Sequence, residues 1–291
     1  MISAAKLPFL QRMIRHRLSG RAAACPYCGE SSRLKRIARK KLVLDVFQCE
    51  RCLLMFRWPM ETPEEFTRYY QQAYTEGAIT DLPSPEELAR LCAAGFRGGA
   101  LDLAGKILML RALQPSGRVL DYGCSWGYGV HQLRESGFHA IGYEVSAPRA
   151  AYGRAGLGVE ILETPQALAS LPAGSFDGLF SNHVVEHLPA LAAAFDEFFR
   201  LLRPGGLLFL VLPNFNGAAA RNGQFLSWIG EAHPVAPTRE FFLRNLPAHG
   251  FTSIRCASGP FTEIAAEQVA LGRFDALETE GDELLVLARK A

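Results

Sequence analysis

Two acidic residues and a glycine-rich turn form the segment whose residue types most directly suggest chemistry. Within residues 118–146, a short apolar run ends in Asp121, and a turn containing Gly123 and Gly127 follows. A helical pattern comes next, and a second apolar run ends in Glu144. This order predicts one βαβ unit. Because backbone N–H groups at such a helix start can approach a ligand, and an acid about 20 residues on suits ribose hydroxyls, we expect a nucleoside-containing cofactor.

The glycine spacing argues against a dinucleotide as that cofactor. The expected G-x-G-x-x-G is absent, since the chain reads G-C-S-W-G-Y-G from Gly123. Asp121 lies two residues earlier, where it would repel a pyrophosphate but suits the cationic amino-acid end of S-adenosylmethionine (SAM). The predicted cofactor contacts are Asp121, Gly123, Cys124, Ser125, Gly127, Glu144, Val145 and Asn182.

This segment resembles the first motif of the class I SAM-dependent methyltransferases, which commonly reads D-x-G-C-G-x-G. Here it reads D-Y-G-C-S-W-G, with Ser125 in place of the middle glycine. The F-D-x-apolar run at Phe176, the R-P-G-G run ending at Gly206 and the later Pro213-Asn214 are also similar to this family. The resemblance implies an α/β fold with a Rossmann-like seven-stranded sheet, in which the last two strands form an antiparallel hairpin.

Four cysteines form a second candidate site. Cys25, Cys28, Cys49 and Cys52 are spaced C-x2-C-x20-C-x2-C, which is the arrangement of a four-cysteine zinc site. Residues 41–48 between the two pairs alternate like a strand, so the pattern predicts a zinc ribbon. The zinc would be structural, because four thiolates leave no open coordination position. Paired cysteines of this kind indicate a metal site in a reducing cytoplasm rather than disulfides.

Charge is distributed unevenly along the 291 residues. Residues 1–58 hold thirteen Lys/Arg and three acids, a net +10, so the remainder carries −8 of the chain's +2. A basic part on an acidic body suggests an anionic partner, namely a membrane surface, a nucleic acid or a phosphorylated substrate. We find no apolar run long enough to span a membrane and no secretion signal, and therefore expect a cytoplasmic protein.

The N-terminal residues favour a short basic amphipathic helix, which could contact an anionic membrane peripherally, dock on its own protein or form a frayed tail. Beyond the ribbon, Tyr69, Tyr70 and Tyr74 could be helix core or could reach the cofactor pocket. The order of elements in this chain resembles a group of bacterial methyltransferases linked to sugar and polysaccharide biosynthesis: a ribbon, then a tyrosine-rich helix, then a SAM motif. The predicted units are the basic segment 1–24, the ribbon 25–58, a helical linker or lid 59–115, and a methyltransferase domain 116–291 with an insertion at about 214–237.

Histidines near the end of the predicted fourth strand are the catalytic candidates. His183, Glu186 and His187 spell H-x-x-E-H, the inverted zinc-protease pattern, but that pattern requires a helix, whereas His183 follows a strand and Pro189 restarts the structure. In many class I methyltransferases, the histidine of this E-H pair only shapes the cofactor loop.

Two further roles for this segment remain open. Small-RNA 3′-terminal and ubiquinone-pathway O-methyltransferases carry E-x-x-E-H here and bind a divalent metal; His183 replaces the first Glu, and His233 could add a ligand. Two imidazoles and a carboxylate suit Zn²⁺, Mn²⁺ or Fe²⁺. Alternatively, His183 or His233 acts as the general base for a hydroxyl acceptor, because histidine titrates near neutral pH.

These patterns predict a SAM-dependent methyltransferase acting on a small-molecule or glycan-linked acceptor. An RNA methyltransferase that grips phosphates with the basic ribbon is the first alternative. The second alternative is a non-catalytic scaffold that keeps the SAM fold, an interpretation favoured only by Ser125. The sequence does not indicate the acceptor, the methylated atom or the oligomeric state.

Overall fold

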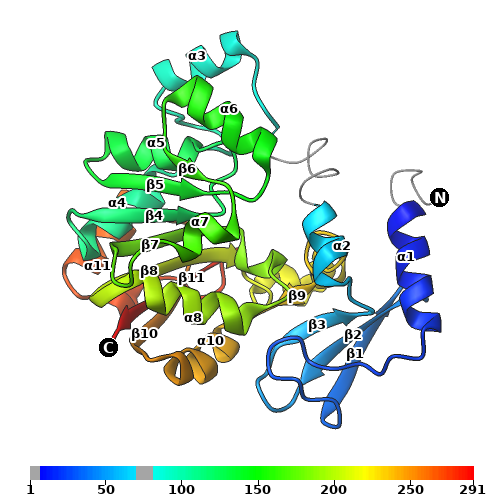
Figure 1. Ribbon diagram of the computed structural model, residues 1–291. Coiled ribbons are helices and arrows are strands. Elements are labelled where there is room, and N and C mark those ends of the chain that lie inside the picture. Colours follow the sequence, from blue (N-terminus) through cyan, green and yellow to red (C-terminus); the bar gives the residue numbers. More distant parts are fainter. Residues whose placement is uncertain (1–6, 70–80) are drawn as a thin grey trace.

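The computed structural model describes residues 7–69 and 81–291, which build two β-sheets. A seven-stranded sheet has the order β10-β11-β8-β7-β4-β5-β6, and a four-stranded sheet has the order β1-β2-β3-β9 (Figure 1). The strands are β1 (Leu34–Lys40), β2 (Leu44–Cys49), β3 (Met55–Trp58), β4 (Arg118–Tyr122), β5 (His139–Tyr143), β6 (Ile161–Leu162), β7 (Phe176–Asn182), β8 (Leu202–Pro213), β9 (Val235–Ala236), β10 (Phe251–Ser258) and β11 (Glu283–Lys290).

Helices follow the strands and cover both faces of the larger sheet. Ile107 and Leu110 of one helix and Val130 of the next pack on one face, while Phe195 and Phe241 pack on the other. The helices are α1 (Leu7–Leu18), α2 (Pro63–Arg68), α3 (Pro85–Ala93), α4 (Ala104–Leu113), α5 (Tyr128–Glu135), α6 (Ala147–Leu157), α7 (Pro165–Ala169), α8 (Leu191–Leu201), α9 (Phe225–Trp228), α10 (Arg239–Asn245) and α11 (Glu263–Ala270), with short turns η3 (Val185–His187), η4 (Ala220–Gln224), η5 (Leu246–His249) and η6 (Phe274–Ala276).

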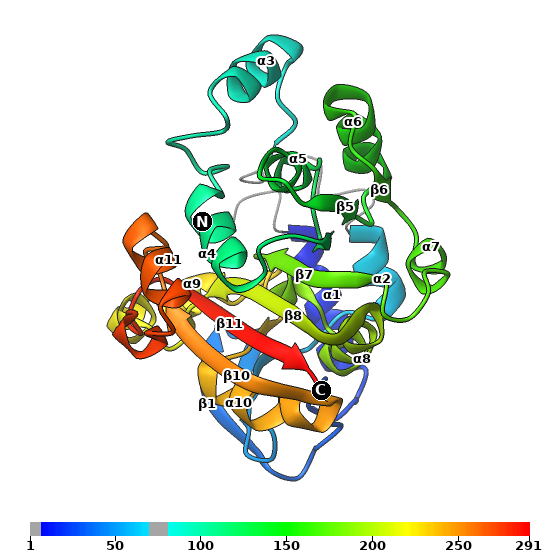
Figure 2. The ribbon, with the colours of Figure 1, turned by 90° about the vertical axis from the view of Figure 1, so that its left-hand side faces the viewer.

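The larger sheet confirms the predicted fold. β4 pairs in parallel with both β5 and β7, and β7 pairs in parallel with β8. β11 lies antiparallel between β8 and β10, as expected for the closing hairpin (Figure 2). Since parallel strands bring their carboxyl ends to one edge, Asp121, Glu144 and Asn182 gather at the edge where such sheets bind ligands.

The smaller sheet carries the cysteines but differs from the expected ribbon in two ways. Residues 41–48 were predicted as one strand, whereas β2 begins only at Leu44, because Lys41 and Leu42 adopt positive φ angles of 51° and 60° in a turn. The basic segment before that turn forms the additional strand β1, and the two-residue strand β9 from the insertion pairs with β3. The sheet therefore extends beyond residues 25–58.

Helix α1 docks on the smaller sheet. Phe9, Leu10 and Met13 are buried against Leu44, which matches the interpretation of a helix docked on its own protein. Contact of this basic segment with a membrane stays a prediction. Among the described residues, no helix is long and apolar enough to cross a membrane. Tyr70 and Tyr74 lie outside the described residues, so their predicted roles stay predictions. Tyr69 directly follows α2 and is half-buried.

Candidate active site

The turn after β4 is shaped to bring the backbone close to a ligand. Gly123 has a φ angle of 79°, and a Cβ there would lie 2.4 Å from Cγ2 of Val184. A side chain at this position would therefore be both strained and blocked. The Gly123 and Cys124 N–H groups donate to Tyr143 O at 2.8 and 3.1 Å, which ties the turn to the neighbouring strand β5. At the start of α5, Gly127 has a φ angle of 81°.

Glu144 lies directly opposite this turn. Its Oε2 accepts from the Ser125 N–H at 3.0 Å, and its Oε1 accepts from the Ser146 N–H at 2.7 Å. Burial raises the pKa of Glu144, while these two hydrogen bonds and nearby Arg149 act in the opposite direction. A buried carboxylate held at the end of β5 has the position and the acceptor capacity to bind two ribose hydroxyls.

Asp121 is the more deeply buried of the two acids. Its carboxyl group packs against α5, since a Cβ on Gly129 would lie 2.4 Å from Asp121 Oδ2. Burial, with a smaller effect from Glu144, raises the pKa of Asp121 to about 8. A nearby ammonium group would favour the ionised carboxylate, so this environment is compatible with the predicted contact to the cationic end of SAM.

The remaining predicted cofactor residues take different positions. The Cys124 side chain is buried, and its Sγ packs against Gly142 of β5, where an added Cβ would lie only 2.4 Å away. Only the backbone of Cys124 can therefore face a ligand. Val145 is half-buried against the larger apolar core. Asn182 Oδ1 accepts a hydrogen bond from Lys106 Nζ at 2.8 Å.

Arg149 was not anticipated from the sequence and is the main addition to the cofactor end. It lies on α6 with 1% of its surface exposed, and its Nη1 donates to Ser125 Oγ at 2.8 Å. The serine that departs from the family motif thus has a specific partner. Ser125 has a φ angle of 51°, an uncommon conformation for a residue other than glycine. No local sequence pattern connects the two residues, which are brought together only by the packing of α6.

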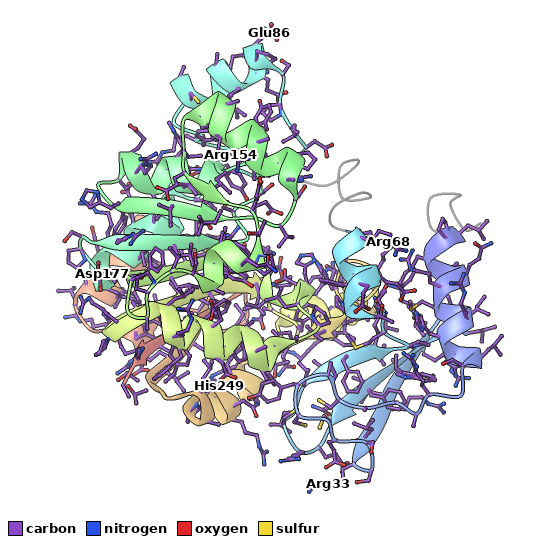
Figure 3. All side chains as sticks on the ribbon, in the orientation of Figure 1. Arg33, Arg68, Glu86, Arg154, Asp177 and His249 are labelled. Carbon is purple, nitrogen blue, oxygen red and sulfur yellow. The ribbon has the colours of Figure 1, made fainter. Side chains whose placement is uncertain are left out.

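Replacing Arg149 with methionine is expected to weaken SAM binding about tenfold at neutral pH, the scale of one hydrogen bond to a charged group. The loss of the cation would raise the pKa of Glu144 further, so the deficit should be larger at pH 6 than at pH 8.5. Calorimetric titration with S-adenosylhomocysteine (SAH) at both pH values measures this. Arg154→Met is the matched control on α6 (Figure 3), because Arg154 pairs with Glu163 near the surface. Equal affinities for Arg149→Met and wild type would contradict the assigned role.

The predicted catalytic residue His183 lies directly after the end of β7. His183 has a φ angle of 56°, and its N–H donates to Val211 O at 2.7 Å. Its imidazole Nε2 lies 2.6 Å from Glu283 Oε1, and its Nδ1 lies 3.4 Å from Glu186 Oε1. Lys106 Nζ donates to the same oxygen of Glu283 at 2.6 Å. The His183 side chain is 39% exposed, so it is accessible to an incoming molecule.

This network determines the charge of His183. Burial alone would lower its pKa, but Glu186 and Glu283 outweigh that effect and raise the pKa of His183 to about 9. Although burial acts against ionisation of Glu283, contact with His183 and Lys106 lowers the pKa of Glu283 to about 2. At neutral pH the pair is therefore an imidazolium and a carboxylate. Lys106 and Glu283 come from α4 and β11, and no sequence pattern links them to the predicted site.

Glu186, His187 and His233 form a second, deeper cluster. One potential ligand atom from each lies within 4.8 Å of the others. Glu186 is fully buried, and its Oε1 lies 3.4 Å from His183 Nδ1 and 3.8 Å from His187 Nε2. These are ion-pair distances, and neither carboxylate oxygen accepts a well-formed hydrogen bond among the described residues. His187 Nδ1 lies 2.7 Å from Ala232 O, and burial lowers the pKa of His187. Burial and the neighbouring His187 lower the pKa of His233 to about 4. The structure thus brings His233 to the segment that also carries His183.

The four cysteines converge at one end of the smaller sheet. Their sulfur atoms all lie within 4.8 Å of one another, with Cys25 Sγ 3.4 Å from Cys52 Sγ and Cys28 Sγ 3.6 Å from Cys49 Sγ. In a tetrahedral site with Zn–S bonds of about 2.3 Å, the sulfurs would be about 3.8 Å apart. The donor set and its spacing therefore fit the predicted structural zinc.

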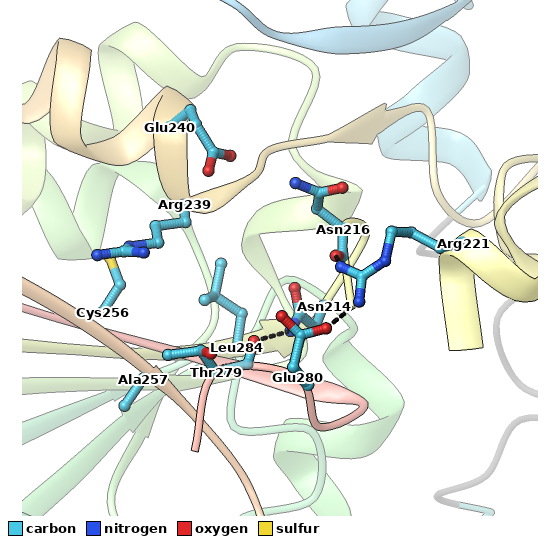
Figure 4. A pocket seen from close by; sticks show the side chains of 10 residues that line it. All are labelled: Asn214, Asn216, Arg221, Arg239, Glu240, Cys256, Ala257, Thr279, Glu280 and Leu284. Atoms are coloured by element: carbon cyan, nitrogen blue, oxygen red, sulfur yellow. Dashed lines mark hydrogen bonds and ion pairs between the residues drawn. The ribbon is translucent and has the colours of Figure 1, made fainter. Parts of the chain in front are cut away.

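A separate pocket opens beside the larger sheet, between α10, β10 and residues 279–284 (Figure 4). Arg221 and Glu280 form an ion pair across its rim, and Asn214 Nδ2 donates to Thr279 O at 3.2 Å. The pocket is lined by Asn214, Asn216, Arg221, Arg239, Glu240, Cys256, Ala257, Thr279, Glu280 and Leu284. None of the predicted cofactor or catalytic residues is among them, so we do not assign it to the site.

The parallel sheet, the glycine turn and the acid after β5 together define a class I SAM-dependent methyltransferase fold. A family model described as "Methyltransferase domain" matches residues 97–255, just over half of the chain. The chain belongs to this methyltransferase domain family.

Two individual relatives match over shorter segments. A "probable S-adenosylmethionine-dependent methyltransferase" of Mycolicibacterium smegmatis is 36% identical over 101 residues, covering 33% of this chain and 38% of the relative. A ubiquinone biosynthesis O-methyltransferase of Hahella chejuensis is 30% identical over 112 residues, covering 36% and 47%. The chain thus spans less than half the length of these relatives.

A solved structure extends the likeness in fold to most of the chain. The 1,6-didemethyltoxoflavin-N1-methyltransferase of Burkholderia thailandensis, with 1,6-didemethyltoxoflavin and SAH bound, matches 89% of this chain and 100% of its own with a TM-score of 0.52. The two sequences are 16% identical, so this match shows the fold alone.

Proposed function

We propose that this protein transfers a methyl group from SAM to a small-molecule or glycan-linked acceptor, as part of sugar or polysaccharide biosynthesis. The observation that carries the proposal is that the predicted cofactor residues and the predicted catalytic histidine lie next to each other along one edge of the sheet. Asp121, Gly123 and Glu144 form the cofactor half, and His183 follows the adjacent strand β7. Methyl transfer from a sulfonium is an in-line displacement, so holding donor and acceptor side by side supplies much of the catalysis.

Two measurements test this proposal in sequence. Calorimetry should first show that the wild-type protein binds SAM and SAH, because Asp121, the glycine turn and Glu144 lie together as cofactor binding requires. Radiolabelled methyl transfer should then be measured with sugar nucleotides, with lipid-linked glycans and with RNA as separate acceptors. Transfer to a sugar-containing acceptor is the expected result. SAH binding without transfer to any class would instead favour the non-catalytic scaffold.

An RNA acceptor is supported by the basic composition of the smaller sheet, but several of those charges are already paired. Asp45 accepts from Arg39 Nε at 2.7 Å and from Arg17 Nη2 at 2.8 Å. Glu30 pairs with Arg33 at 3.2 Å. Intramolecular pairing leaves fewer cations to contact phosphates. A gel shift that weakens steeply between low and high salt would favour the RNA alternative.

His183→Ala separates the proposed roles of this residue. If His183 is the general base, the variant should lower kcat by roughly 10²–10⁴ with nearly unchanged SAH affinity. Because a base must be deprotonated, and the pKa of His183 is raised to about 9, the wild-type rate should increase with pH until about 9. If His183 only shapes the loop, SAH affinity and turnover should fall together by a modest factor. A rate that does not increase between pH 7 and 9 would contradict the base role.

A catalytic metal is the second proposed role for this region. Glu186, His187 and His233 supply the mixed donor set that suits Zn²⁺, Mn²⁺ or Fe²⁺ better than Mg²⁺. His183, a possible ligand on sequence grounds, does not belong to this trio. Its Nε2 lies 2.6 Å from Glu283 Oε1, and its Nδ1 lies 3.4 Å from Glu186 Oε1. A chelator that abolishes transfer while the cysteine-bound zinc remains, with recovery on adding Mn²⁺, would support the metal. Unchanged transfer after chelation would exclude the metal and leave the base role and the loop-shaping role, which His183→Ala separates.

A further inference from the structure

The smaller sheet and the insertion of the larger unit are built into each other. β9 lies beside β3 (Figure 1), with Phe56 opposite Val235 and Met55 opposite Ala236. The Arg57 N–H also donates to Pro234 O at 2.9 Å, which extends the pairing by one hydrogen bond. The insertion therefore supplies β9, the outer strand of the cysteine-bearing sheet, and residues 229–234 lead directly into that strand.

Side chains from the smaller unit bind three successive residues just before β9. Lys40 Nζ donates to the carbonyl oxygen of Ile229, and Arg57 Nε donates to that of Gly230. On the next residue, Arg12 Nη2 of α1 lies 3.1 Å from Glu231 Oε1.

Arg57 is the centre of this contact. It is fully buried, its Nη1 donates to Pro59 O at 2.6 Å, and its Nη2 pairs with Glu61. Its guanidinium lies over the ring of Phe9, 5.1 Å from the centroid. A buried guanidinium with several fixed acceptors has little freedom, so the Gly230 carbonyl that it binds is also held in place.

The segment held in this way reaches the acceptor side of the site. His233 follows Glu231 by two residues, and its ring lies 4.7 Å from that of His187. His187 in turn contacts Ala232 O through Nδ1. Arg57 is thus connected to these two histidines by direct contacts and by residues that are adjacent in the chain.

We propose that the cysteine-bearing sheet is a fixed wall of the acceptor site, and that Arg57 is a positioning residue that sets the placement of His187 and His233 through segment 229–236. The proposal rests on the proposed function in that these histidines line the acceptor site. The proposal extends that function, because the cysteine-bearing sheet would help to form the acceptor site, in addition to any role in binding a partner. Among the described residues, the hydrogen bonds, the ion pair and the cation–π contact of Arg57 all join it to residues outside 118–149.

Hydrogen exchange and histidine NMR on the full chain test this proposal. In Arg57→Met, amides of 229–236 should exchange about tenfold faster than in wild type, while those of 118–149 stay unchanged. The imidazole signals of His187 and His233, assigned with His187→Asn and His233→Asn, should shift because their ring contact changes. Arg57→Lys, which keeps the charge but not the planar fork, should shift them as well. SAH affinity should stay within about twofold of wild type.

Arg39→Met is the matched control, because among the described residues the hydrogen bond and ion pair of Arg39 go to Asp45 within the smaller sheet. It should leave the exchange of that segment and both histidine signals unchanged. If Arg57→Met does not fold, Lys40→Met provides the same measurements through the Ile229 carbonyl.

A folded Arg57→Met or Lys40→Met protein with wild-type exchange in 229–236 and unshifted histidine signals would overturn the proposal. Failure of the proposed function would be recognised separately, as absence of SAH binding or methyl transfer in the wild-type protein. The exchange and NMR results do not depend on either activity.

Discussion

Cys49→Ser is expected to remove the bound zinc and to unfold the smaller sheet. Cys49 is fully buried at the end of β2, and its sulfur lies 3.6 Å from that of Cys28. Structural zinc contributes about 10–16 kcal/mol of apparent binding free energy in small domains, far more than a ribbon of this size gains from its apolar core. Freshly purified wild-type protein should contain about one zinc per chain by elemental analysis, and the variant should contain almost none.

Cys256→Ser is the matched control for this experiment, since Cys256 lies on β10 and its sulfur does not belong to the cluster. It should retain both zinc and fold. Wild-type protein that contains no zinc when freshly prepared would contradict the ribbon assignment. Limited proteolysis locates the damage: cleavage in Cys49→Ser should concentrate within residues 25–58, with residues 118–213 protected for longer.

Glu144→Ala should weaken SAM binding by about 1.5–3 kcal/mol, or roughly 10- to 150-fold, the range for hydrogen bonds to a charged group. The carboxylate also accepts from the Ser125 and Ser146 N–H groups, so its removal releases the turn as well as the proposed ribose contact. Calorimetric titration with SAH gives the affinity directly.

Glu160→Ala provides the comparison for that measurement, because Glu160 is exposed and belongs to the segment that precedes β6. It should bind SAH like the wild type. Undiminished affinity in Glu144→Ala would refute the assigned role of Glu144, even if methyl transfer were affected. An intermediate variant, Glu144→Gln, should retain part of the affinity, because its carbonyl oxygen can still accept one hydrogen bond.

The sequence predicted the larger sheet well because each of its central strands is an apolar run with a distinct ending. Asp121 and Glu144 mark the ends of β4 and β5, and both lie where the βαβ pattern predicts. The smaller sheet was harder to predict. β1 reads LKRIARK and is largely exposed, so its alternation is masked by basic side chains. β9 has two residues and no periodicity that a sequence can reveal.

In the candidate site as well, residues within a short motif could be predicted from the sequence, whereas residues that meet only in the folded chain could not. Gly123 and Ser125 lie in a short motif, so their spacing alone identified them. Arg149, Lys106 and Glu283 became visible only through packing, because each meets its partner across a large sequence separation. The charge of His183 could not be predicted either, since it depends on Glu283, which lies 100 residues further along the chain.

The pairing of β3 with β9 also affects the order in which the chain can fold during synthesis. The cysteine-bearing residues leave the ribosome first, yet the strand that completes their sheet follows most of the larger unit. Until residues 235–236 emerge, the backbone groups along one side of β3 have no strand partner, and such an edge can pair with other chains. Contacts of this sequence separation slow folding, because the loop between them must close first. We therefore expect truncated chains that end before β9 to aggregate more readily than chains that extend just beyond it.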